Sequence, residues 1–169
     1  MTSQLDVVLK TDSLPTLTLE TTLTQDPKSV HTWITQTYQN IKANNSHQKA
    51  VVGIDTEWWK DGEVALLQLC FDTRVLVYQI IRSNFIPFSL IEFLNDGNLM
   101  FTGVNTKEDF VKLARYGLAR GGKDNREYFL SKIKDLQDGP GIKNKSLAKL
   151  LEELSGYKID KDKSVSSSN

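Results

Sequence analysis

The chain has 169 residues, of which 39% are hydrophobic and 25% are charged, and this composition suits one packed domain over residues 1–169. Its 21 basic and 21 acidic side chains cancel, which excludes a global field that attracts nucleic acid or an anionic membrane. A single cysteine excludes an intrachain disulfide, and together with only two histidines it argues against a zinc site.

The first predicted elements are two strands and a helix. Residues 5–10 and 16–23 are rich in β-branched and alternating apolar residues, so we expect an antiparallel pair of strands. Asp26 and Pro27 mark a helix start, because an N-cap residue is followed by proline at the first helical position. Apolar residues at helical spacing extend this helix to about residue 42.

The middle of the chain has the pattern of a sheet with one crossover. Residues 50–56 form a near-continuous β-branched run, which is typical of a central strand covered on both faces. Residues 64–71 and 74–80 are separated by Asp-Thr and predict a tight hairpin. A short helix over residues 87–94 leads to a further strand over residues 99–104. This order predicts an α/β fold, with a mixed sheet and helices on its faces.

The rest of the chain is predicted to be mainly helical. One helix covers residues 106–118, and a second is expected within residues 126–136. Ser146 caps a short helix that closes at Gly156. Residues 161–169 form a polar tail rich in serine.

Two acids stand out at the end of the predicted central strand. Asp55 and Glu57 lie two residues apart, so their side chains project from the same face, at an edge where open α/β sheets bind ligands. Neighbouring carboxylates repel each other, and a divalent cation removes this repulsion. Oxygen-only ligands favour Mg²⁺ or Mn²⁺. The alternative is an exposed strand end whose charges block edge pairing.

Other candidate residues also have a structural alternative. Asp109 can join the metal site from the next helix, or it can complete a capping box with Thr106. Trp58 can stack on a terminal base or pack in the core. Lys107 can contact a phosphate or lie on a solvated helix face. Basic side chains outnumber acidic ones over residues 107–149, and they can likewise form a patch that binds phosphates or lie on solvated helix faces.

The stretch VVGIDTEWW, the hairpin after it and the stretch FTGVNTKEDF resemble the 3′–5′ exonuclease domain of the ribonuclease D and Werner-syndrome type, within the DEDD superfamily. The resemblance runs from about residue 20 to the end of the chain. It implies a ribonuclease H-like fold, with a mixed five-stranded sheet flanked by helices. It also implies hydrolysis of phosphodiester bonds from the 3′ end of DNA or RNA, with two Mg²⁺ or Mn²⁺ ions.

The resemblance assigns catalytic and metal-binding roles to Asp55, Glu57 and Asp109. Asp55 would be shared by both ions, Glu57 would hold the ion that carries the attacking water, and Asp109 would assist the second ion. Asn105 stands where the family often has glycine. Four residues beside the motifs are expected to contact the nucleic acid: Thr56, Trp58, Asn105 and Lys107.

The third motif of the family, a Tyr-x-x-x-Asp on a last helix, has no match up to Asn169. The resemblance therefore implies that this chain lacks the last helix and the fourth metal ligand. Sheet surface left exposed by that helix would be covered by self-association or by a partner chain. Two hypotheses follow. One is a 3′–5′ exonuclease whose activity is weak or absent in this shortened chain, and the other is a catalytically silent domain that binds nucleic acid or protein.

Targeting signals are not apparent in the sequence. The first residues lack a basic head followed by an apolar block, and no apolar run approaches the roughly 20 residues that span a bilayer. We therefore expect an intracellular protein, nuclear or cytoplasmic and not secreted, with no membrane as partner.

Overall fold

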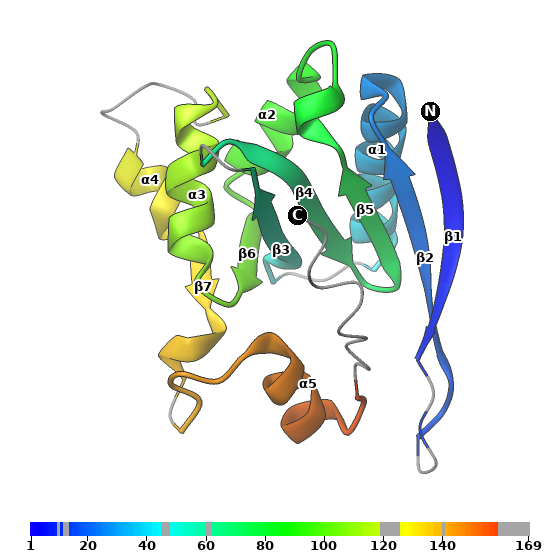
Figure 1. Cartoon of the computed structure of the whole chain (residues 1–169), viewed down its shortest axis with the longest axis vertical. Helices are drawn as coiled ribbons and strands as arrows, with labels where there is room; N and C mark the ends of the chain where they lie inside the picture. Colours follow the sequence, from blue (N-terminus) through cyan, green and yellow to red (C-terminus); the bar gives the residue numbers. More distant parts are fainter. Residues whose placement is uncertain are drawn as a thin grey trace.

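In the computed structural model, one mixed β-sheet runs through the described residues, which are 1–9, 11, 14–44, 48–59, 62–118, 126–139 and 141–158. Over these residues the sheet has seven strands in the order β1-β2-β5-β4-β3-β6-β7 (Figure 1). The pairs β1–β2, β3–β4 and β4–β5 are antiparallel, and the pairs β2–β5, β3–β6 and β6–β7 are parallel. In chain order the strands are β1 (Thr2–Leu9), β2 (Leu17–Thr24), β3 (Ala50–Trp58), β4 (Val64–Phe71), β5 (Arg74–Tyr78), β6 (Leu99–Gly103) and β7 (Ile133–Asp135).

The helices begin and end close to the predicted positions. Asp26 caps the first helix, because its carboxylate accepts hydrogen bonds from the backbone N–H groups of Lys28 and Ser29 while Pro27 opens the first turn. Among the described helices, none is long and apolar enough to cross a membrane. The helices are α1 (Pro27–Ala43), α2 (Phe88–Asn95), α3 (Thr106–Arg115), α4 (Arg126–Ser131) and α5 (Leu147–Ser155), with short 3₁₀ turns η1 (Ile80–Arg82) and η3 (Leu136–Asp138).

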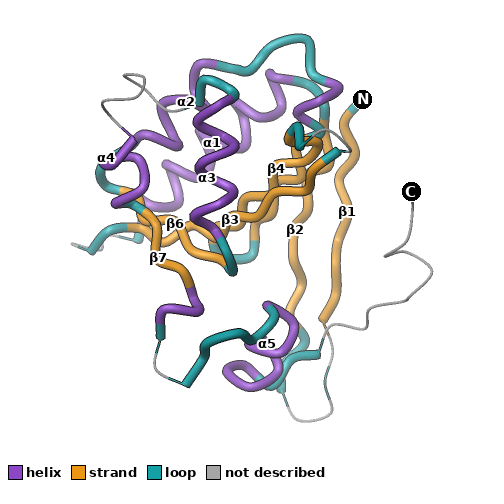
Figure 2. Tube along the Cα trace, turned by 60° about the vertical axis from the view of Figure 1, so that its left-hand side comes forward, coloured by secondary structure: helices purple, strands orange, loops and turns teal. Residues whose placement is uncertain are grey.

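One face of the sheet is covered by helices. Side chains alternate along β3, so Val52, Ile54 and Thr56 share a face, and all three are buried. Figure 2 shows α1, α2 and α3 on one side of the sheet, and apolar side chains from these helices join the core cluster that contains Val52 and Ile54. A row of edge-on and tilted aromatic contacts runs through this core: Trp33, Phe93, Phe101, Phe110 and Phe129.

The opposite face is only half covered over the described residues. It carries Gly53, Asp55 and Glu57 of β3, and Gln68 and Cys70 of β4 lie opposite Asp55 and Gly53. Glu57 is exposed, and the other four are partly exposed. We call this the open face of the sheet. Its cover by self-association or by a partner chain stays a prediction.

The fold differs from the sequence prediction in two places. The sheet exceeds the five strands that the family resemblance implied, because the hairpin β1–β2 adds two strands beside β5. Residues 126–136 contain the predicted helix as α4, but the strand β7 that follows it was not predicted. The change comes at Lys132, whose carbonyl accepts a hydrogen bond of 2.9 Å from Phe101 N–H, so the chain leaves the helix to pair with β6.

Three further predictions are left open by the structure. The polar tail predicted over residues 161–169 lies outside the described residues. The single-domain organisation of residues 1–169 and the nuclear or cytoplasmic location stay predictions.

Candidate active site

The two acids of the central strand lie at its carboxyl end, on the open face. Asp55 lies opposite Gln68 of the neighbouring strand β4, and the side-chain Nε2 of Gln68 donates a hydrogen bond of 3.3 Å to Asp55 Oδ2. Glu57 lies opposite Leu66, and the pairing register shifts between Glu57 and Trp58. Such an irregularity bends a strand and redirects its last side chains. The predicted shared orientation of Asp55 and Glu57 agrees with this register.

Asp109 reaches the same region from the connection between β6 and α3. Gly103 lets this connection approach β3, since a Cβ there would lie 2.4 Å from Ile54 O and 2.5 Å from Thr106 Cγ2. Asn105 then adopts a left-handed conformation with φ 59° and ψ 25°, which asparagine tolerates better than most residues. This turn places the first residues of α3, including Asp109, against the end of β3.

A short chain of hydrogen bonds holds the Asp109 carboxylate. Thr56 Oγ1 donates to Asp109 Oδ1 at 2.5 Å, and Trp58 Nε1 donates to Thr56 Oγ1 at 2.6 Å. Because Thr56 faces the helices, Asp109 meets β3 on the covered face, whereas Asp55 projects from the open face. The sequence did not indicate this division of the acids between the two faces.

The environment of Asp109 disfavours its ionised form. Only 4% of the residue is exposed, and burial raises the pKa of its carboxyl from 3.8 to about 6. The hydrogen bond from Thr56 opposes this rise in pKa, and the negative charge of Asp55 adds to it. The Asp55 charge thus acts on Asp109 although the two side chains lie on different faces of β3.

A pocket at the end of β3 collects the acids predicted from the sequence. It has a volume of about 370 Å³, and Asp55, Glu57 and Asp109 line it together with Glu108. Their oxygen-only donors suit a hard divalent cation such as Mg²⁺ or Mn²⁺. In the part of the chain that the structure describes, however, no three acidic, histidine or cysteine side chains gather closely enough to form a metal cluster. The donor chemistry fits a divalent ion, and the three acids are neighbours around one pocket.

The predicted nucleic-acid contacts fall into two groups. Thr56, Trp58 and Asn105 line the same pocket, and 41% of Trp58 is exposed. Lys107 lies on α3 outside this pocket and forms an exposed ion pair of 3.5 Å with Asp138. The structure therefore brings three of the four residues to the acidic pocket. Lys107 instead lines a neighbouring groove of α3 together with Lys112 and Arg115, which we call the basic groove.

Two features of the site were missed at the sequence level. Gln68 contacts Asp55 from the adjacent strand, and the short connection between the end of β3 and the start of β4 was the signal that could have indicated this register. Lys112 places its ammonium over the ring of Trp58, one helical turn after Asp109. This contact keeps the indole beside the pocket and accounts for part of its cover.

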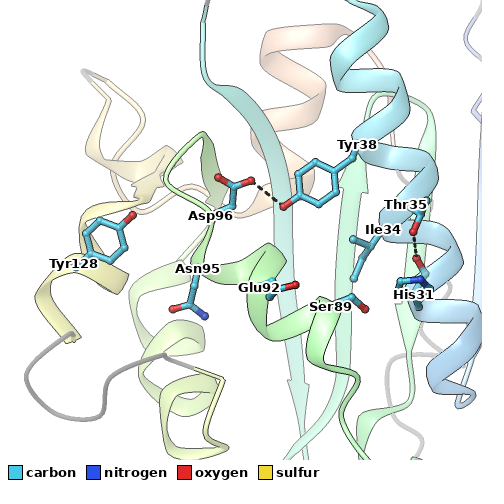
Figure 3. Close-up of a pocket in the computed structure, with 9 residues that line it drawn as sticks. All are labelled: His31, Ile34, Thr35, Tyr38, Ser89, Glu92, Asn95, Asp96 and Tyr128. Carbon is cyan, nitrogen blue, oxygen red and sulfur yellow. Dashed lines mark hydrogen bonds between the residues drawn. The ribbon is translucent and has the colours of Figure 1, made fainter.

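A second pocket lies on the helical side of the sheet, away from Asp55 and Glu57. It has a volume of about 540 Å³ and is lined by residues of α1, α2 and α4 (Figure 3). The Tyr38 hydroxyl donates a hydrogen bond of 2.8 Å to Asp96 Oδ2, and Asn98 N–H donates to Asp96 Oδ1 at 2.9 Å. Asp96 therefore fixes the end of α2 onto α1, and we assign this pocket a structural role.

Comparison with known proteins gives partial matches in sequence and broader matches in structure. No family model matches the chain. A curated 3′-5′ exonuclease of Drosophila mojavensis is 36% identical over 70 residues, which is 38% of this chain and 21% of that protein. The 3′-5′ exonuclease of Drosophila melanogaster is 33% identical over 70 residues, which is 38% of this chain and 20% of that protein. The matches thus span about a fifth of each curated relative.

Solved structures of an exonuclease domain share the fold. The EXD2 exonuclease domain soaked in Mg has a TM-score of 0.56 and 20% identity, over 70% of this chain and 57% of that one. The EXD2 domain soaked in Mn and GMP has a TM-score of 0.54 and 19% identity, over 88% and 74% of the two chains. The chain therefore has a mixed α/β, ribonuclease H-like fold. The EXD2 exonuclease domain is a solved structure with this fold.

Proposed function

We propose that this chain is a metal-dependent 3′–5′ exonuclease domain of the DEDD superfamily, of the ribonuclease D and Werner-syndrome type. The observation that carries the proposal is the pocket at the end of β3, which is lined by Asp55, Glu57 and Asp109 in a fold shared with an exonuclease domain. The EXD2 structures were soaked in Mg, Mn, GMP and dGMP, which supports divalent ions and nucleotides as the ligand classes here.

In this proposal the three acids hold Mg²⁺ or Mn²⁺. Asp55 and Glu57 offer oxygen ligands from the open face, and Asp109 offers its carboxylate from the start of α3. When bound there, such ions would supply an activated water and would neutralise the charge that develops on the phosphate. Gln68 orients Asp55 through its hydrogen bond, and Thr56 orients Asp109 in the same way.

The same pocket offers contacts for the end of a nucleic-acid strand. Trp58 is partly exposed beside the acids, so a terminal base can stack on its indole. Asn105 is exposed at the pocket rim and can donate to a phosphate or sugar oxygen. Lys107 and the basic groove of α3 can attract the phosphate backbone, and this attraction weakens as salt rises.

A nuclease assay tests the proposal. Oligonucleotides of DNA and RNA labelled at the 5′ end are incubated with Mg²⁺ or Mn²⁺ and separated by length. The proposal predicts a ladder of products shortened one nucleotide at a time from the 3′ end, which is lost in Asp55→Asn and in Glu57→Gln. Glu108→Gln is the matched control, because Glu108 lines the same pocket without an assigned role. A parent protein that yields no ladder, or a ladder that survives Asp55→Asn, contradicts the proposal.

A catalytically silent binding domain is the second candidate. It is favoured by the absence, among the described residues, of three metal-binding side chains in one cluster and by the hydrogen bond that holds Asp109 on the covered face. This candidate predicts that the labelled oligonucleotide binds in a gel-shift assay and stays intact. Binding that persists in Asp55→Asn without any cleavage by the parent would favour the silent domain over the enzyme.

A further inference from the structure

β1 is the outer edge of the sheet, and half of its backbone groups point away from β2. Gln25 N–H donates a hydrogen bond of 3.4 Å to Met1 O, and this pair continues the register of β1 with β2. Since hydrogen-bonded pairs alternate along an antiparallel ladder, the odd-numbered residues of β1 direct their backbone groups to β2. Independently, Glu20 N–H bonds to Thr73 O next to β5, so the even-numbered residues of β2 face β5 and the odd ones face β1. The outward backbone groups of β1 therefore belong to its even-numbered residues: Thr2, Gln4, Asp6 and Val8.

This edge lacks most features that protect exposed strands from pairing. β1 has eight residues in continuous register with β2 and contains no lysine or proline. It also exposes apolar side chains, with 49% of Leu5, 43% of Val7 and 44% of Val8 accessible. Figure 1 shows β1 as the outermost strand of the sheet, beyond β2. The edge is thus long, regular and apolar enough to accept another strand.

We propose that β1 pairs antiparallel with β1 of a second copy of this chain, around a twofold axis that passes between the two Leu5 residues. The choice of a second copy rests on the self-complementarity of this edge. In this register Gln4 of each copy lies opposite Asp6 of the other, so each of the two Asp6 carboxylates faces an amide that can donate a hydrogen bond to it. Thr22 already donates to Gln4 Oε1 at 3.0 Å, which leaves the amide nitrogen of Gln4 to meet the carboxylate.

Neighbouring registers are less favourable. A twofold axis keeps residues of equal parity opposite each other, so the register moves in steps of two. An axis at Gln4 places Asp6 opposite Thr2 but leaves the outward backbone groups of Val8 without a partner in β1. An axis at Asp6 places two carboxylates face to face, which is destabilising. An axis at Val7 leaves Asp6 opposite Val8, where the carboxylate has no partner. The register around Leu5 also pairs the outward groups of Thr2 with those of Val8, so the free backbone edge is satisfied from Thr2 to Val8.

The proposed interface consists of one strand pair, so it is small, at the low end of specific interfaces. We therefore expect a reversible dimer whose population rises with protein concentration, measured by analytical ultracentrifugation. The dimer forms whether or not the acidic pocket is catalytic, so the two proposals fail independently. A parent protein that sediments as a monomer over the whole accessible range of concentration overturns the proposal.

Disulfide trapping tests the register. The two Leu5 residues form a non-hydrogen-bonded pair with Cα atoms about 4.5 Å apart, which suits a disulfide. With Cys70→Ser as background, Leu5→Cys should cross-link into a dimer under mild oxidation. Val7→Cys is the matched control, because Val7 is equally exposed but lies opposite Ser3, about 13 Å from its own copy. Cross-linking of Val7→Cys instead of Leu5→Cys overturns the register.

A charge exchange tests the same contact without cysteine. Leu5→Lys and Leu5→Glu each place like charges across the axis, so each variant alone should sediment as a monomer with an unchanged circular-dichroism spectrum. An equimolar mixture should restore the dimer, because lysine then faces glutamate. A mixture that stays monomeric, or a Leu5→Lys variant that dimerises like the parent, overturns the proposal and assigns the edge to another partner or to none.

Discussion

Removing the Thr56 hydroxyl should destabilise the protein by an amount that depends on pH. This hydroxyl donates to the buried Asp109 carboxylate at 2.5 Å and accepts from Trp58 Nε1 at 2.6 Å. Thr56→Val keeps the shape of the side chain but leaves both partners without the hydroxyl. A hydrogen bond to a charged group contributes about 1.5–3 kcal/mol, and one between neutral groups contributes about 1 kcal/mol.

The two states of Asp109 set the size of the effect. The pKa of Asp109 is about 6, so the carboxyl is mainly ionised at about pH 8 and mainly protonated at about pH 5. Because the hydrogen bond from Thr56 lowers this pKa, its loss must cost more when the carboxylate is charged. We expect Thr56→Val to lower the free energy of unfolding by about 2 kcal/mol at about pH 8 and by about 1 kcal/mol at about pH 5.

Urea unfolding followed by tryptophan fluorescence measures both values in metal-free buffer. Thr56→Ser is the control, since it keeps the hydroxyl and should lose less stability at both pH values. If Thr56→Val costs the same at the two pH values, the hydroxyl does not act on the ionised Asp109, and the hydrogen-bonded chain from Trp58 to Asp109 is wrong.

The remaining stability predictions concern three buried residues, Asp109, Gly103 and Phe101. Burial raises the pKa of Asp109 from 3.8 to about 6, so its ionisation opposes folding: stability from this group is full below about pH 4 and falls by up to about 3 kcal/mol as pH rises through 6. Asp109→Asn should therefore exceed the parent in unfolding free energy at about pH 8 without metal, and a lower value refutes this reasoning. Gly103→Ala should lose about 1–3 kcal/mol in urea, because its Cβ would meet Ile54 O at 2.4 Å; an unchanged midpoint contradicts the close approach. Phe101→Ala should lose about 3–5 kcal/mol, since Phe101 is fully buried between Phe93 and Phe110, and a loss below about 1 kcal/mol would place it outside the core.

The sequence predicted the parts of the fold that depend on local patterns. The start of α1 at Asp26 and Pro27, and the cap of α5 at Ser146 with its left-handed end at Gly156, follow from residue preferences that act within a few positions. Asp55 and Glu57 share a face because strands alternate with a period of two. These features need no information from distant parts of the chain.

The parts that were missed depend on long-range contacts. β7 forms because Ile133 pairs with Phe101 of β6, and nothing near residue 133 distinguishes a strand of three residues from the end of a helix. The position of Asp109 depends on the close approach at Gly103 and on the left-handed Asn105, which direct the start of α3 to Thr56. Helical spacing alone predicted where α3 begins, but it could not say which face of β3 the Asp109 carboxylate would meet.

Calorimetric titration with Mn²⁺ is the most direct test of the central claim that the acids at the end of β3 hold divalent ions. We predict saturable binding by the parent chain in metal-free buffer, competition by Mg²⁺, loss of binding in Asp55→Asn and unchanged binding in Glu108→Gln. If Asp55→Asn binds Mn²⁺ as the parent does, or if the parent shows no binding even with a nucleoside monophosphate present, the acids do not form a metal site and the exonuclease proposal fails.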